Sequence, residues 1–157
     1  MGKVVLPNDI LLDEVARLLS EGRDVVMTPK GRSMLPFIRG EVDCVVLRQL
    51  PKVEVGDIVL AHFGNQYVLH RVVAVEDENV VLMGDGNLRG TEVMERKDIV
   101  GKVVEIITPT GQHHKPSRGW LWRKLLPIRK YLLKIYRKWN KIKTSSRVSR
   151  HEVPSQK

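Results

Sequence analysis

A serine at a constrained corner is the first residue whose surroundings could support chemistry. Ser33 lies in the stretch KGRSMLPFI, directly after a helical pattern has ended. Pro36 fixes its own φ and favours an extended conformation in the residue before it, whereas Gly31 permits a tight or left-handed turn. A side chain held at such a corner is either a nucleophile or an ordinary part of a turn, and the stretch alone leaves both interpretations open.

A nucleophilic serine needs a base, because its hydroxyl reacts poorly until a neighbouring group takes the proton. His70 is the best candidate, since it lies with Arg71 in the otherwise apolar stretch YVLHRVVAV, where an ionisable side chain needs a partner. The alternative is a strand histidine with satisfied hydrogen bonds. His62, on an alternating strand, and His113 and His114, in a polar loop, are weaker candidates.

An acidic turn follows a third apolar run. The stretch VVLMGDGNLRG places Asp85 between two glycines at the end of a strand pattern. This is favourable turn chemistry, and a simple turn is one interpretation. The other is that the glycines let a second backbone segment approach Asp85 closely.

Taken in order, these motifs resemble the serine peptidase group that joins type I signal peptidases with LexA-like self-cleaving repressors. The resemblance covers roughly residues 24 to 105, and each of its motifs is short. The matching segments are Ser33-Met34-Leu35-Pro36, Val55-Gly56-Asp57-Ile58-Val59, His70-Arg71-Val72-Val73, Gly84-Asp85-Gly86-Asn87 and Ile99-Val100-Gly101-Lys102-Val103-Val104. The resemblance implies a mostly antiparallel β fold and peptide-bond hydrolysis.

The resemblance also implies roles for individual residues. Ser33 matches the nucleophile, and His70 matches the general base, as in the archaeal and endoplasmic-reticulum signal peptidases; a histidine base benefits from an acid that fixes its tautomer. Asp85 is our first choice for that acid and Glu92 the second, and a Ser/His dyad is the third option. Gly31 replaces a serine that assists some signal peptidases, so backbone N–H groups around Ser33 would stabilise the oxyanion.

The hydrophobic pattern predicts the elements that must position these residues. A helix capped by Asn8 or Asp9 and closed by Gly22 is expected within residues 1–23. Short β-rich runs follow, with a hairpin turn at Gly64-Asn65 and another turn near residues 76–79. The strands are expected at 24–28, 43–48, 57–63, 66–75, 79–83 and 99–107. We therefore expect a mainly β protein, an antiparallel β domain over residues 24–109 with a helix at each end.

The charge is distributed unevenly. Residues 1–105 hold 13 Lys and Arg and 17 Asp and Glu, whereas residues 106–157 hold 14 Lys and Arg and one acid. The body is thus mildly acidic and the C-terminal third strongly basic. The lone cysteine, Cys44, excludes an intramolecular disulfide and a thiolate zinc cluster and is expected to be a small buried residue. No cofactor is expected.

The basic C-terminal third predicts a surface-binding helix. After a linker at residues 110–119, apolar residues recur at helical spacing over residues 120–143, with basic residues between them and a kink or restart at Pro127. Residues 144–157 are expected to be disordered. We expect residues 120–143 to contact an anionic membrane surface; packing on the β domain or on a partner protein, and nucleic-acid binding, are the alternatives.

The sequence therefore predicts a serine endopeptidase that cuts a precursor or leader peptide through an acyl-enzyme on Ser33. The alternative is a catalytically inactive peptide-binding module of the same fold, held at a membrane surface. Because neither an export signal nor an apolar run of membrane-spanning length is seen, we expect the protein in the cytoplasm, at the inner face of the membrane. The 30 residues before the serine corner leave no room for a helix-turn-helix domain.

Overall fold

The structure is a computed structural model that describes residues 8–148. The chain divides after Trp120 into two compact units. The first holds the helix α1 (Asn8–Ser20) and eight antiparallel strands, and the second holds most of α2 (Trp120–Lys124) and all of α3 (Arg129–Val148). The prediction of a mainly β protein with a helix at each end is confirmed.

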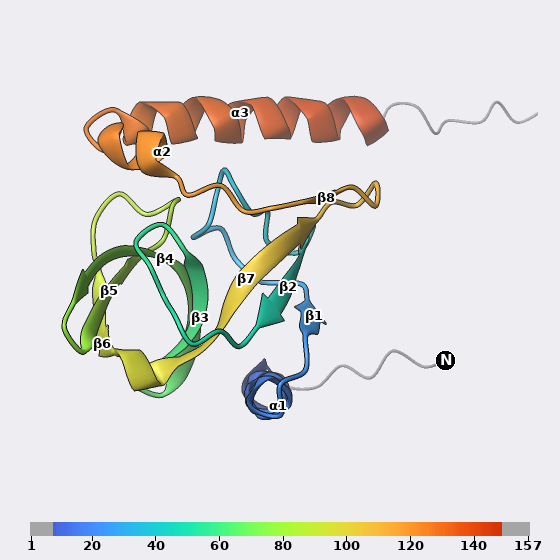
Figure 1. Cartoon of the computed structure of the whole chain (residues 1–157). Helices are drawn as coiled ribbons and strands as arrows, with labels where there is room; N and C mark the ends of the chain where they lie inside the picture. The colour runs from blue at the N-terminus through green and yellow to red at the C-terminus, as the bar shows by residue number, and fades with distance from the viewer. Residues whose placement is uncertain (1–7, 149–157) are drawn as a thin grey trace, which may run out of the picture. The chain divides into compact units, whose positions relative to one another are not determined.

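The strands form one strongly curled sheet (Figure 1). In sequence they are β1 (Val25–Met27), β2 (Cys44–Arg48), β3 (Ile58–Phe63), β4 (Gln66–Glu76), β5 (Asn79–Met83), β6 (Glu92–Glu95), β7 (Ile99–Ile107) and β8 (His113–His114). A single 3-10 turn, η1 (Arg96–Asp98), connects β6 to β7. The sheet order is β1-β2-β7-β3-β4-β5-β6, with β8 added to β7.

Local chemistry explains the turns between these elements. Gly22 ends α1 in a left-handed conformation with φ +79°, and its N–H donates to the Leu19 carbonyl. Gly64 lies in the tight β3–β4 turn, where Phe63 pairs with Gln66. Both turns were predicted from sequence, and both are confirmed.

Two apolar clusters hold the sheet together. Residues such as Leu19, Leu47 and Val103 lie in the first, between α1 and the β1-β2-β7 part of the sheet. Val59, Val72 and Leu82 belong to the second, inside the curl formed by β3 to β6. Leu19 packs on β7 at Gly101, where an added Cβ would lie 2.9 Å from its Cδ1. This close packing fixes the position of α1 on the sheet.

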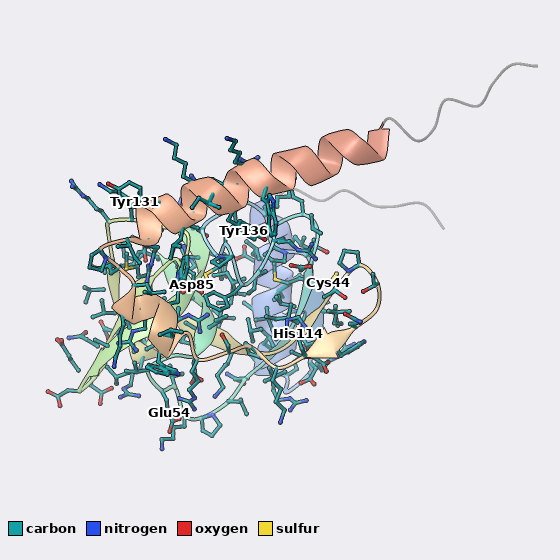
Figure 2. The ribbon with its side chains drawn as sticks, turned by 90° about the horizontal axis from the view of Figure 1, so that it is seen from above. Cys44, Glu54, Asp85, His114, Tyr131 and Tyr136 are labelled. Atoms are coloured by element: carbon teal, nitrogen blue, oxygen red, sulfur yellow. The ribbon has the colours of Figure 1, made fainter. Side chains whose placement is uncertain are left out.

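Some predicted boundaries differ from the structure. The expected linker at residues 110–119 contains β8, and Arg118 donates to the Val55 carbonyl and to Glu54, so this segment lies on the β domain. Cys44 was expected to be buried but is only half-buried, because it is the first residue of β2; its Sγ lies 3.3 Å from the Thr28 hydroxyl. Figure 2 shows Cys44 and Glu54 on the ribbon.

The C-terminal helical segment is interrupted where the sequence predicted. α2 ends at Lys124 and α3 begins at Arg129, on either side of Pro127. α3 continues past residue 143 to Val148, so the start of the expected disordered tail is helical, and residues 149–157 lie outside the described part of the chain. No helix among residues 8–148 is long and apolar enough to cross a membrane.

Candidate active site

Ser33 lies in a compact turn between β1 and β2. Its neighbours Met34 and Leu35 are buried, at 4% and 7% exposure, while Ser33 itself is half-buried. The Leu35 N–H donates to the Arg32 carbonyl, and the Ile38 N–H donates to the Met34 carbonyl. The serine therefore directly precedes two buried apolar residues that anchor the turn.

The Gly-Asp-Gly turn after β5 packs directly on the backbone of this corner. The Gly86 N–H donates to the Ser33 carbonyl at 2.7 Å. A Cβ added at Gly84 would lie 2.6 Å from the same carbonyl oxygen, and one at Gly86 would lie 2.5 Å from the Arg32 oxygen. Both glycines are required by this close approach, which the sequence had offered as the alternative to a simple turn.

The backbone around Ser33 offers hydrogen-bond donors. Among residues 8–148, neither the Ser33 N–H nor the Met34 N–H donates to a backbone carbonyl. Gly31, two residues earlier, has φ +83°, and its carbonyl oxygen would lie 1.9 Å from a Cβ added at Gly40. These two glycines let the loop segments around residues 31 and 40 approach each other closely.

His70 is the second component of the site. It lies on β4, is 7% exposed, and its Nδ1 is 3.0 Å from Oε2 of Glu92 at the start of β6. The side chain of Glu92 is 20% exposed, so the pair is close to solvent but largely covered. Since Nδ1 is engaged by this carboxylate, Nε2 is the ring nitrogen left for proton transfer.

Ser33 and His70 line the same pocket, which has a volume of about 250 Å³. Most of its other lining is apolar or backbone, with contributions from α1, β1, β3 and β4. No hydrogen bond joins the Ser33 hydroxyl to His70 within the described part of the chain. Catalytic hydrogen bonds often tighten only in the substrate complex, so the shared pocket is the geometric link between the two residues.

Asp85 occupies a different position from the one we predicted. Its carboxylate accepts from Arg71, with Nε 2.8 Å from Oδ1 and Nη2 2.7 Å from Oδ2, and both side chains are at most 3% exposed. The acid that accepts from His70 is Glu92, our second choice. The reason is strand geometry, because His70 and Arg71 are consecutive residues and point to opposite faces of β4.

Arg71 is the centre of a buried network. Its Nη1 donates to the carbonyl oxygens of Gly56 and Ser117, and its guanidinium lies 5.0 Å from the Phe37 ring. Asp85 supplies the compensating charge that such a buried cation requires. In Figure 2 Asp85 lies within the β domain, whereas Glu54 lies at its margin. The network ties the serine turn, the Gly-Asp-Gly turn and residue 117 together.

The weaker histidine candidates lie outside this pocket. His62 on β3 packs edge-on against Tyr67, with ring centroids 4.9 Å apart, and Nδ1 of His113 lies 3.1 Å from Glu105. Within residues 8–148 no cluster of His, Cys, Asp and Glu has the arrangement of a metal site.

A search against protein-family models and a search among curated proteins found no match to the chain. The case for a function therefore depends on the residues and geometry described above.

Tyr67 is a pocket residue that sequence reasoning did not identify. Its hydroxyl donates to Asp13 of α1 at 2.8 Å. Burial, together with this bond and the charge of Asp13, raises the pKa of Tyr67 to about 12. The only sequence signal was an aromatic residue on the strand that carries His70. The contact fixes α1 at the rim of the pocket.

Proposed function

We propose that this protein is a serine endopeptidase that cleaves a peptide bond through an acyl-enzyme on Ser33. The observation that carries the proposal is that Ser33 and His70 share one pocket while Glu92 holds the other side of the His70 ring. A nucleophile, a base within the same pocket and an acid behind the base are the components of a serine hydrolase site.

In the proposed reaction, His70 Nε2 takes the hydroxyl proton as Ser33 Oγ attacks the peptide carbonyl carbon. The oxyanion receives hydrogen bonds from the N–H groups of Ser33 and Met34, and Glu92 stabilises the imidazolium. Collapse breaks the C–N bond, and the leaving amine takes the proton from His70. Water, deprotonated by His70, then attacks the ester carbon and releases the acid product and Ser33.

The pocket favours an extended peptide segment with an apolar side chain as substrate. Leu12, Met34 and Leu60 contribute to its lining beside the serine and histidine. Apolar lining with a few convergent polar groups is typical of a binding site. A precursor or leader peptide with an accessible extended segment is the substrate class that we infer.

A second candidate function is a peptide-binding module without catalysis. The observation in its favour is that Ser33 and His70 do not form a hydrogen bond among the described residues, although they share the pocket. Such a module would use the same apolar lining and would leave the bound peptide intact.

A serine-directed fluorophosphonate probe distinguishes the two functions. We expect the probe to label the wild-type chain at Ser33, and we expect Ser33→Ala and His70→Ala to abolish labelling. Ser20→Ala, which removes an exposed hydroxyl that donates to the Arg17 carbonyl, is the matched control and should leave labelling unchanged.

Cleavage itself is tested with a library of apolar precursor peptides followed by mass spectrometry. Wild-type protein should produce fragments, and the Ser33→Ala and His70→Ala proteins should not. Equal cleavage by wild type and either variant would refute the assignment. Peptide binding without labelling or cleavage would establish the second function.

A further inference from the structure

The described part of the second unit, residues 121–148, carries charge of one sign. Residues 121–148 contain ten Lys and Arg residues and no Asp or Glu. Isolated helices of soluble domains commonly mix both signs, because opposite charges one turn apart stabilise the helix. This segment has no such pairs, so its charge favours an anionic partner.

The same unit exposes a continuous apolar face on α3. Ile128, directly before the helix, and Tyr131, Ile135 and Trp139 within it follow one another at intervals of 3, 4 and 4 residues, the spacing of one helix face. Their side chains are 48%, 57%, 64% and 65% exposed. Tyr136, also labelled in Figure 2, is half-buried and lies on a different side of the helix. The exposed face contains two aromatic and two aliphatic residues.

Exposed basic side chains flank this face. Lys134 and Lys138 lie one turn apart beside Tyr131 and Ile135 on the helix surface, and both are exposed. Lys130 Nζ lies 4.8 Å from the Tyr131 ring centroid. Figure 2 shows nitrogen-tipped side chains extending outward from α3. Long basic side chains can lay their methylene groups along an apolar surface while their charges reach outward.

Exposed apolar residues continue through the break at Pro127, from α2 to α3. Arg129 Nη2 donates to the Trp122 carbonyl at 3.0 Å, and its guanidinium lies 5.3 Å from the Trp122 ring. These contacts join the end of α2 to the start of α3. Leu126, at the bend, is 47% exposed, so the bend presents apolar surface to solvent as α3 does.

We propose that the α2–α3 segment binds the surface of an anionic lipid bilayer, with α3 lying in the plane of the interface. An interfacial helix combines an apolar face with Trp or Tyr and a polar face rich in Lys and Arg. α3 has both, and it is too polar to span the bilayer. Charge attraction brings the helix to the headgroups, and the apolar face inserts at the acyl boundary.

A bilayer fits these observations better than nucleic acid or a protein groove. Phosphate contacts account for the basic residues, but a duplex backbone offers no apolar layer for exposed Ile128 and Ile135. A protein groove accounts for the apolar face, but ten Lys and Arg residues with no Asp or Glu among them would need a strongly acidic partner. A bilayer with anionic headgroups accounts for both features with one occupant.

Flotation of the full chain with vesicles tests the proposal. One vesicle set is phosphatidylcholine alone, and the other holds roughly three parts phosphatidylcholine to one part phosphatidylserine. We expect the chain to float with the second set only. Binding should weaken by more than about tenfold when salt rises from about 0.1 M to about 1 M, because the Debye length falls to about 3 Å. Equal flotation with both sets would overturn the proposal.

A matched pair of substitutions tests whether vesicle binding depends on the apolar face of α3 or on any exposed apolar residue. Ile135→Asp places a charge in the apolar face, and Val26→Asp places the same charge on β1, where Val26 is 59% exposed. We expect Ile135→Asp to lower vesicle affinity by at least about tenfold and Val26→Asp to leave it within about twofold. Circular dichroism checks that both variants remain folded. Equal loss in the two variants would contradict docking through α3.

Trp139 supplies a direct readout of insertion. In a Trp120→Phe/Trp122→Phe chain, Trp139 is the remaining tryptophan, and its emission should shift to the blue and be quenched by brominated acyl chains. Emission that is unchanged by anionic vesicles, or vesicle binding that is displaced by equimolar single-stranded RNA, would refute the lipid assignment. Because none of these measurements uses catalysis, their outcome is independent of the proposed peptidase activity.

Discussion

Two neighbouring residues of β4, His70 and Arg71, are each hydrogen-bonded to a carboxylate, but the two pairs differ in burial and in the number of bonds. Arg71 is paired with Asp85 by three hydrogen bonds at no more than 3% exposure, whereas His70 has one bond to Glu92, which is 20% exposed. Both side chains of the first pair are buried, and Arg71 also donates to the carbonyl oxygens of Gly56 and Ser117. The second borders the pocket. The difference teaches that the number of hydrogen bonds and the depth of burial, not adjacency in sequence, separate the buried structural pair from the pair beside the pocket.

The largest effect is expected from breaking the buried pair. Asp85→Asn removes the charge that compensates Arg71 and should lower the free energy of unfolding by about 3–5 kcal/mol. Urea denaturation measures the change. The control is Asp24→Asn, which breaks the exposed Arg48–Asp24 pair and should lower the free energy of unfolding far less than Asp85→Asn does. If both substitutions lowered the free energy of unfolding equally, burial would not distinguish the two ion pairs.

The pocket pair is expected to affect catalysis more than stability. Glu92→Gln keeps an oxygen near His70 Nδ1 but removes the charge that would stabilise the imidazolium in the proposed reaction. We expect kcat to fall by about 10²–10⁴-fold and the free energy of unfolding to fall by less than in Asp85→Asn, because the amide oxygen can still accept from Nδ1. Glu95→Gln, at an exposed position of the same strand, should leave both unchanged. A stability loss like that of Asp85→Asn would assign Glu92 a structural role instead.

The Gly-Asp-Gly turn carries Asp85 of the buried pair and also contacts the backbone of the serine turn beside the pocket. Gly86→Ala forces a Cβ to within 2.5 Å of the Arg32 carbonyl and should cost about 1–3 kcal/mol of stability. Moving the serine turn by about 1 Å should also lower kcat/KM by about 10²-fold. Gly90→Ala adds strain at φ +89° in open space, so it should reduce stability without the loss in kcat/KM. Unchanged kcat/KM in Gly86→Ala would show that this contact does not position Ser33.

The smallest effect is expected at the rim of the pocket. Tyr67→Phe removes the bond to Asp13 and should cost at most about 1 kcal/mol. Because folding raises the pKa of Tyr67 from 10.0 to about 12, the bond stabilises the fold fully below pH 10 and is lost as the pH rises through 12. Unfolding of wild type and variant measured across this range should therefore converge at alkaline pH. A constant difference between them would contradict the assignment of this bond.

The sequence predicted the long elements better than the short ones. β4 and β7 have extended apolar runs, and both lie within a residue of their predicted bounds. β6, with the sequence EVME, and β8, with HH, were missed because both are short and at least half of the residues in each are charged or polar, unlike the apolar β1. These strands exist because β5 and β7 offer free edges to pair with.

The residues of the site were predicted more fully than their arrangement. Ser33 and His70 were identified from their local surroundings, and Glu92 was the second choice for the acid. The choice between Asp85 and Glu92 depends on the register of β4, β5 and β6, since Leu82 pairs with Val72 on one side and with Glu92 on the other. Sequence spacing does not give that register, because the β5–β6 connection is irregular.

The position of β7 has a consequence for how the protein is made. The serine turn follows β1, His70 lies on β4, and in the sheet order these parts are joined through β7, which ends at Ile107. During synthesis the β1-β2 hairpin and the β3-to-β6 meander can each form, yet the strand that unites them emerges later. Ser33 and His70 are therefore joined through the sheet only after β7 has been translated. Under the proposed function, this order of strands would keep a nascent chain inactive until β7 has paired with β2 and β3.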